Sequence, residues 1–141
     1  MRFLMFYVND TNNTKVPTGI LTILTQLKKD GHEVSLFDNS KYGLEADRND
    51  HTIRGHMLNF QLLDLEPYGV TIEKTTIEQV NKDIASHIKG FSPDIIGISI
   101  TEDTSKTGLR FAGECKQVAP EIPVLMGGVF LFDKTRQGDC Q

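Results

Sequence analysis

The side chains that could do chemistry in this sequence follow directly after short apolar runs. Residues 94–101 (DIIGISIT) are almost wholly apolar, and hydroxyl and carboxylate groups follow at 102–105. A second apolar run, 123–126, ends in the pair Gly127-Gly128. Hydroxyls and carboxylates hydrogen-bond polar ligands, and glycine lets a ligand approach the backbone because no Cβ intervenes. The pattern therefore predicts a site that binds a small molecule.

The elements that would position these groups alternate between strands and helices. Strands are predicted at 2–8, 33–38, 94–101 and 123–126, and helices at 17–30, 76–90 and 105–118. This order predicts a parallel sheet with right-handed crossovers, in the flavodoxin-like, doubly wound α/β class of Rossmann-like three-layer sandwiches. The expected strand order is 2-1-3-4. A fifth strand is missing, so we expect one domain, 1–141, that is truncated at its C-terminus relative to that fold.

Local signals mark the predicted helix boundaries. Pro17 suits the first position of a helix, and Thr76 with Gln79 resembles a capping box. Gly90 is the expected end of the second helix. The residues of the last helix expected to face inward are Leu109, Ala112, Cys115 and Val118 or Ala119.

Residues 40–75 interrupt this alternation. They carry six acidic and four basic side chains, together with an apolar group between 57 and 65. Connections of this length inside a domain are functional or disordered, and the apolar group argues against full disorder. We interpret the stretch as an insertion, with one short helix near 53–63, that caps the sheet edge or meets a partner domain.

Composition excludes several classes of function. The net charge is −4, from 15 basic and 19 acidic residues, without a basic stripe, which argues against nucleic acid and anionic membranes as partners. Cys115 and Cys140 lack metal-ligand spacing, and His51 and His56 are wrongly spaced for one helix face. The apolar run 3–8 is too short for a signal sequence or a membrane span, so a cytoplasmic protein is expected.

In a 2-1-3-4 sheet the topological switch point lies between the first and third strands. The loops 9–19 and 101–107 meet there, with Gly127-Gly128 alongside, and all three lie at the carboxyl edge of the sheet, where α/β proteins bind ligands. The loop that starts at Asn9 is polar and is expected to lie outside the core.

Four motifs together resemble the cobalamin-binding domain that precedes the radical SAM domain in cobalamin-dependent radical SAM enzymes. They are PTGIL at 17–21, DGHEV at 30–34, PDIIGIS at 93–99 and IPVLMGG at 122–128. The resemblance spans about residues 2 to 130, and the motifs arrive in the family's order. It implies a cobalamin-binding module that holds base-off, His-off cobalamin for methyl transfer or radical chemistry carried out with another domain.

The resemblance also implies roles for individual residues. Ser99 and Thr101 would hydrogen-bond the nucleotide tail of the cofactor, and Gly127 and Gly128 would let that tail lie against the backbone. The residues implied at the corrin ring are Val16, Pro17, Thr18, Gly19, Glu102, Asp103 and Thr104 at its lower face and Val129 and Phe130 at its edge.

The sequence departs from related patterns in three places, and one is 129–131 (VFL), where the family usually carries a threonine or His-Ala-Thr just after Gly-Gly. Loop 9–19 contains no histidine, and Asn12 stands where methionine-synthase-like relatives carry the cobalt ligand. The three-cysteine motif of radical SAM enzymes is absent. A [4Fe–4S] cluster and S-adenosylmethionine would therefore belong to a radical SAM domain in cis or in trans, and the parent enzyme would be a methyltransferase or a relative. No catalytic residue is assigned to this chain.

Other readings of the same residues stay open. A receiver-like module would use Asp10 after the first strand, whereas a nucleotide- or flavin-binding module would need a glycine-rich phosphate loop that the first turn lacks. A fragment unable to fold without a fifth strand is a third reading. Ser99 and Thr101 could also be satisfied polar groups at a strand end, and Gly127-Gly128 a plain turn.

Overall fold

One parallel sheet organises the chain. The computed structural model describes residues 1–9, 17–42, 66–69, 75–101 and 104–128. Its strands are β1 (Arg2–Tyr7), β2 (Glu33–Asp38), β3 (Ile95–Ser99) and β4 (Val124–Gly127). All pair in parallel, in the order β2-β1-β3-β4. The predicted α/β fold, of the flavodoxin-like or Rossmann-like kind, is confirmed together with its strand order.

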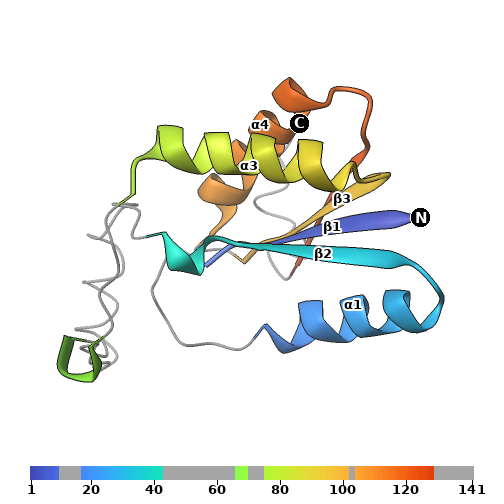
Figure 1. Ribbon diagram of the computed structural model, residues 1–141, viewed down its shortest axis with the longest axis horizontal. Coiled ribbons are helices and arrows are strands. Elements are labelled where there is room, and N and C mark those ends of the chain that lie inside the picture. The colour runs from blue at the N-terminus through green and yellow to red at the C-terminus, as the bar shows by residue number, and fades with distance from the viewer. Residues whose placement is uncertain (10–16, 43–65, 70–74, 102–103, 129–141) are drawn as a thin grey trace, which may run out of the picture.

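Helices lie on both faces of this sheet. Figure 1 shows α3 (Ile77–Phe91) and α4 (Ser105–Val118) on one side and α1 (Thr18–Lys29) on the other. Two short 3₁₀ turns, η1 (Asn39–Lys41) and η2 (Glu66–Tyr68), follow β2 and precede α3. Within the described ranges, no helix has both the length and the apolar character needed to cross a membrane. The helix predicted near 53–63 lies outside the described residues.

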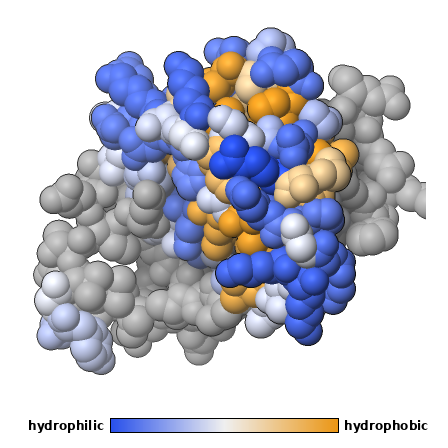
Figure 2. All heavy atoms as spheres, turned by 45° about the vertical axis from the view of Figure 1, so that its right-hand side comes forward, coloured by the Kyte–Doolittle hydropathy of each residue, from blue (hydrophilic) through white to orange (hydrophobic). Residues whose placement is uncertain are grey.

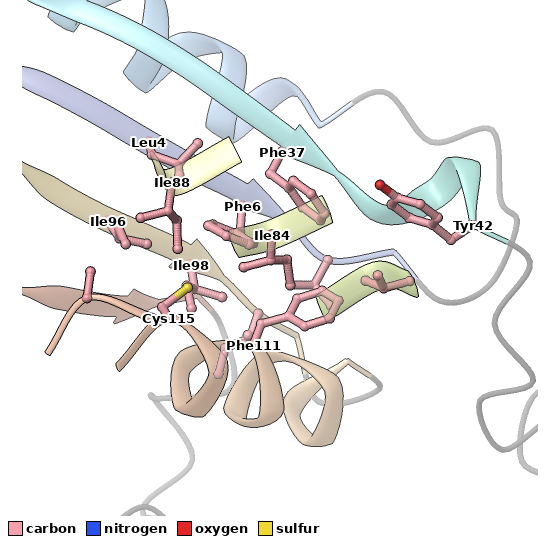
Figure 3. Packing of buried hydrophobic residues seen from close by; sticks show 14 residues of the cluster. Leu4, Phe6, Phe37, Tyr42, Ile84, Ile88, Ile96, Ile98, Phe111 and Cys115 are labelled. Atoms are coloured by element: carbon pink, nitrogen blue, oxygen red, sulfur yellow. The ribbon is translucent and has the colours of Figure 1, made fainter. Parts of the chain in front are cut away.

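The main core fills the space between the sheet and the helices α3 and α4. Apolar side chains alternate along β1 and β3, so that Phe6 and Ile98 point toward Ile84 of α3 and Phe111 of α4 (Figure 3). The Phe6 and Phe111 ring centroids lie 6.0 Å apart. Both strands bury this face beneath two helices. The helix α1 packs on the other face of β1, which agrees with the near-continuous apolar sequence of that strand.

The inward face of α4 differs from the predicted one. Cys115 is buried as expected, but Leu109 is 37 % exposed while Phe111 and Gly108 are buried. A Cβ on Gly108 would overlap the Cγ2 methyl of Ile100. The glycine therefore lets α4 approach the end of β3 closely, and this rotation of the helix turns Phe111 toward the core and Leu109 toward solvent.

The helix boundaries follow the sequence signals with small shifts. Pro17 lies just before α1 as its N-cap, one residue earlier than predicted. The hydroxyl of Thr76 accepts a hydrogen bond from the Gln79 backbone N–H at 3.2 Å, which is one half of a capping box. The other half is not formed, because the Gln79 side chain donates to Asp83 instead. The helix α3 ends at Phe91 and not at Gly90, and Ser92, with a positive φ of 49°, is its C-cap.

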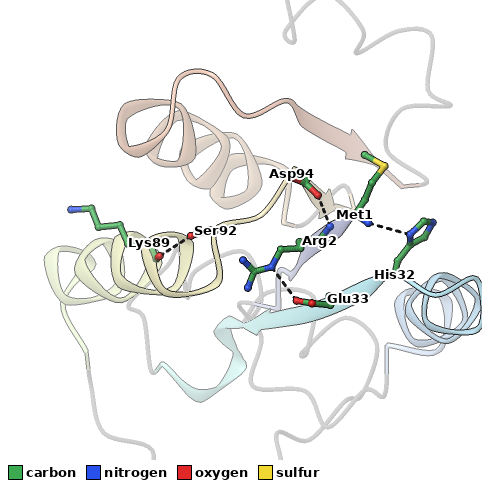
Figure 4. A network of polar contacts seen from close by, with 7 residues as sticks. All are labelled: Met1, Arg2, His32, Glu33, Lys89, Ser92 and Asp94. Carbon is green, nitrogen blue, oxygen red and sulfur yellow. Dashed lines mark hydrogen bonds and ion pairs between the residues drawn. The ribbon is translucent and has the colours of Figure 1, made fainter.

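Polar contacts join the strands at the amino edge of the sheet. The backbone N–H of Arg2 donates to Asp94 at 2.7 Å, and its Nε donates to Glu33 at 3.0 Å (Figure 4). Near them, the N-terminal amine lies 3.5 Å from Nδ1 of His32, in the turn between α1 and β2. These contacts tie β1 to the segments before β2 and β3, so this edge is occupied by the protein's own polar groups.

Candidate functional site

The carboxyl edge of the sheet brings Ser99, Thr101 and Gly127 together. The register places Ser99 at the end of β3 between Tyr7 of β1 and Gly127 of β4. The backbone N–H of Ile100 then donates to the Gly127 carbonyl at 2.8 Å, which extends the pairing by one residue. The prediction that these strand ends meet at one edge is confirmed.

A turn between β3 and α4 fixes the two threonines. The backbone N–H of Thr101 donates to the hydroxyl of Thr104 at 2.9 Å, and the two hydroxyl oxygens lie 3.2 Å apart. Thr104 is buried, whereas Thr101 is exposed. Thr104 therefore shapes the turn, and Thr101 is the residue of the pair whose hydroxyl is open to a ligand.

The two consecutive glycines have different surroundings. A Cβ on Gly127 would meet nothing within 4 Å, and the residue is exposed. Gly128 has a φ of +134°, and a Cβ there would overlap the backbone carbonyl of Ile100. The chain's own backbone thus accounts for the glycine at 128. Only Gly127 opens onto free space.

These residues form part of an uncovered surface, which we name the β3–β4 strip and define as Ser99, Thr101, Leu125 and Gly127. Side chains alternate along β3 and β4, so Ile98 and Met126 face the core while Ser99 and Leu125 point to the opposite side. That side carries α1, which packs mainly on β1 and β2. The Leu125 side chain is consequently 60 % exposed.

The hydroxyl of Ser99 is the most informative group in the strip. The residue is half-buried, and its hydroxyl hydrogen-bonds no protein group in the described ranges. A half-buried hydroxyl beside a glycine can donate to, or accept from, a ligand without first breaking a protein contact. The strip thus combines one such hydroxyl, one exposed threonine and one apolar side chain.

Apolar side chains reach the surface elsewhere as well. On α1, Leu21 and Ile23 are 40 % and 51 % exposed, beside the buried Ile20 and Leu24. Figure 2 shows apolar side chains open to solvent between hydrophilic groups on the face that it views. Scattered apolar residues are ordinary on a protein surface. The strip differs from them in combining an apolar residue with hydroxyls at the carboxyl edge of the sheet, the edge where α/β folds bind ligands.

The other predicted site residues are divided between the described and undescribed parts. Pro17, Thr18 and Gly19 lie at the start of α1, at the same edge of the sheet, with Pro17 half-buried and the other two exposed (Figure 1). The predicted contacts that lie outside the described residues are Val16, Glu102, Asp103, Val129 and Phe130.

The sequence did not reveal a polar cluster at the ends of β1 and β2. The N–H of Asn9 donates to the Asn39 side chain at 2.6 Å, and both residues are buried. The expectation that the loop lies outside the core is therefore wrong at Asn9, because the partner amide satisfies its backbone there. The sequence did not predict the burial of Asn9 and Asn39, because asparagine near a turn is usually exposed.

Two further contacts join this region to α3. The hydroxyl of Tyr42 donates to Asp83 at 2.6 Å, and Ser35 hydrogen-bonds His87 at 2.8 Å. Burial, together with the hydrogen bond to Asp83 and its charge, raises the pKa of Tyr42. His87 also packs edge-on against Phe37, which confirms its expected half-buried position. These groups hold β2 and α3 together.

The described part of the chain contains neither a cluster of metal ligands nor a reactive thiol. Its residues contain no group of three or more His, Cys, Asp or Glu side chains placed to hold a metal ion. Cys115 is buried in the core, and burial, with a smaller effect of the Glu114 charge, raises the pKa of its thiol to about 12. This thiol is therefore not a reactive nucleophile near neutral pH.

Comparison with known proteins gave no assignment. No family model, no curated protein and no solved structure matches this chain.

Proposed function

We propose that this chain is a cobalamin-binding module of a radical-SAM-type enzyme, and that the cofactor's nucleotide tail lies on the β3–β4 strip. One observation carries the proposal: the unbonded hydroxyl of Ser99 lies beside the open space over Gly127, at the carboxyl edge of a doubly wound sheet. A ligand placed there would meet a hydroxyl, a bare stretch of backbone and the apolar side chain of Leu125.

These residues suit the parts of the proposed ligand. The Ser99 and Thr101 hydroxyls would bond polar atoms of the tail, and Leu125 would lose much of its 60 % exposure beneath an aromatic base. Pro17, Thr18 and Gly19, at the start of α1, would lie under the corrin ring. Cobalamin held in this way would supply a methyl group or a radical for chemistry on a partner domain.

The proposal places the catalytic groups outside this chain. A radical SAM domain, in cis or in trans, would contribute the [4Fe–4S] cluster and S-adenosylmethionine in a reducing, cytoplasmic setting. Loop 9–19, where methionine-synthase-like relatives carry the cobalt ligand, contains no histidine. We therefore propose a base-off form in which no histidine of this chain ligates cobalt.

Titration of the purified chain with cobalamin, followed by its visible spectrum, tests the proposal. We expect saturable binding with a base-off spectrum that is unchanged when the four histidines are replaced. Ser99→Leu should abolish binding, because the larger side chain fills the space beside Gly127. Ser86→Leu, at an exposed position on α3, is the matched control and should bind normally.

The opposite results would favour other functions. A folded chain that does not bind cobalamin, but binds a flavin or a nucleotide, would replace the proposal with the flavodoxin-like alternative. A histidine variant that loses the base-off spectrum would refute the His-off assignment alone.

A further inference from the structure

Arg110 of α4 is half-buried, and its guanidinium carbon lies 5.3 Å from the centroid of the Phe111 ring, but one edge of the guanidinium has no hydrogen-bond partner. Among the described residues, Nε and Nη2 of Arg110 are fully buried and make no hydrogen bond. The N–H groups on these two atoms point in the same direction, along one edge of the planar guanidinium. This is the edge that recognises a carboxylate or a phosphate with two parallel hydrogen bonds.

Nearby acidic side chains do not use this edge. Glu114 lies one helical turn after Arg110, at the i, i+4 spacing that favours an ion pair. Glu114 nevertheless does not use this edge, since Nε and Nη2 of Arg110 have no hydrogen-bond partner. Burial of unsatisfied N–H donors is unfavourable, so this edge of Arg110 favours an anionic partner supplied from outside the described chain.

A second unpaired polar group lies on the neighbouring helix. The side-chain oxygen of Asn81 on α3 is buried without a hydrogen-bond partner. Asp83 and His87 occupy the flank of α3 that faces β2 and Tyr42, and Asn81 lies on the other flank, toward α4. The helices α3 and α4 pack together, and Asn81 and Arg110 are each in the second turn.

We propose that Arg110 and Asn81 bind the carboxylate or phosphate group of a small ligand between α3 and α4. The guanidinium would donate two hydrogen bonds, and the Asn81 amide, whose nitrogen and oxygen are interchangeable by rotation, would donate a third. This site lies on the opposite side of the sheet from the β3–β4 strip (Figure 1). The inference therefore does not depend on cobalamin binding.

The test is a titration of the full-length, ¹⁵N-labelled chain with inorganic phosphate and, separately, with acetate, at ionic strength matched by chloride. We expect the Nε–H signal of Arg110 to move saturably with at least one of the two anions. A response to phosphate alone would identify a phosphate ligand, and a response to acetate alone a carboxylate ligand. Arg110→Gln should weaken the affinity on the order of tenfold or more, because a charge-assisted pair of bonds is lost.

Lys82→Gln provides the matched control, since Lys82 is an exposed cation beside Asn81 on α3. This variant should keep the wild-type affinity. Equal loss in both variants would overturn the proposal by showing a general charge effect, as would an Arg110 signal that responds to neither anion. If Arg110→Gln does not fold, the proposal is decided by whether the Arg110 signal of the wild type responds to the anions and whether Lys82→Gln keeps the same affinity. Without added anion, Arg110→Met should melt at a higher temperature than wild type.

Discussion

Replacement of Gly128 by alanine tests how the carboxyl edge is built. The residue has a φ of +134°, which side chains other than glycine rarely adopt. A Cβ would also overlap the carbonyl of Ile100, and this contact is with backbone that cannot rotate away. We expect Gly128→Ala to force the ends of β3 and β4 apart.

The magnitude follows from two contributions. A non-glycine residue held in this backbone region costs about 1–3 kcal/mol. Separation of the strands also breaks the 2.8 Å hydrogen bond from Ile100 to Gly127, which contributes about 1 kcal/mol. The free energy of unfolding should therefore fall by about 2–4 kcal/mol. For a domain of this size the melting temperature would drop by about 7–14 °C.

Urea and thermal unfolding, followed by circular dichroism, measure this loss. Gly127→Ala is the matched control, because a Cβ there meets nothing within 4 Å. Its free energy of unfolding should stay within about 0.5 kcal/mol of wild type. Equal stability of the two variants would refute this prediction, because the two neighbouring glycines have different surroundings.

Three further predictions concern the core and its ionisable groups. Gly108→Ala should lower the free energy of unfolding by about 1–3 kcal/mol, because the added methyl group overpacks the core. Gly113 faces open space, so Gly113→Ala should raise the free energy of unfolding by about 0.5–1 kcal/mol. Urea unfolding measures both changes. The pKa of Tyr42 is raised above 10.0 by burial and a neighbouring carboxylate. The protonated Tyr42 hydroxyl therefore stabilises the fold below pH 10, and this stabilisation is lost as the pH rises further. The free energy of unfolding of Tyr42→Phe should consequently fall less steeply above pH 10 than that of the wild type. In a Cys140→Ser background, Cys115 should react with a thiol reagent at pH 8 only after unfolding, because it is buried; rapid reaction of the folded protein would contradict this.

The fold could be predicted from sequence because local and global signals agree. The run at 94–101 is apolar on both faces, and β3 is indeed an inner strand between β1 and β4. The helix predicted at 105–118 was found with the same bounds. Strand order alone predicted that Gly127-Gly128 lies alongside the end of the third strand, and the register pairs Gly127 with Ser99.

The predictions of side-chain burial that were wrong concern residues whose environment is set by contacts distant in sequence. The exposure of Leu109 follows from the contact of Gly108 with Ile100, which helical periodicity does not contain. Asn9 is buried because Asn39, thirty residues away, satisfies its backbone. The sequence likewise did not predict the unpaired edge of the Arg110 guanidinium, because an arginine on an amphipathic helix is ordinarily exposed to solvent.

Amide chemical-shift mapping with cobalamin tests the central proposal most directly, because it reports folding, binding and location in one experiment. We predict that the signals of Ser99, Thr101, Leu125 and Gly127 move saturably as cobalamin is added, while those of Ser86 and Lys82 on the outer surface of α3 stay in place. A well-dispersed spectrum in which none of the four strip signals moves would contradict the proposal that this chain holds cobalamin on the β3–β4 strip.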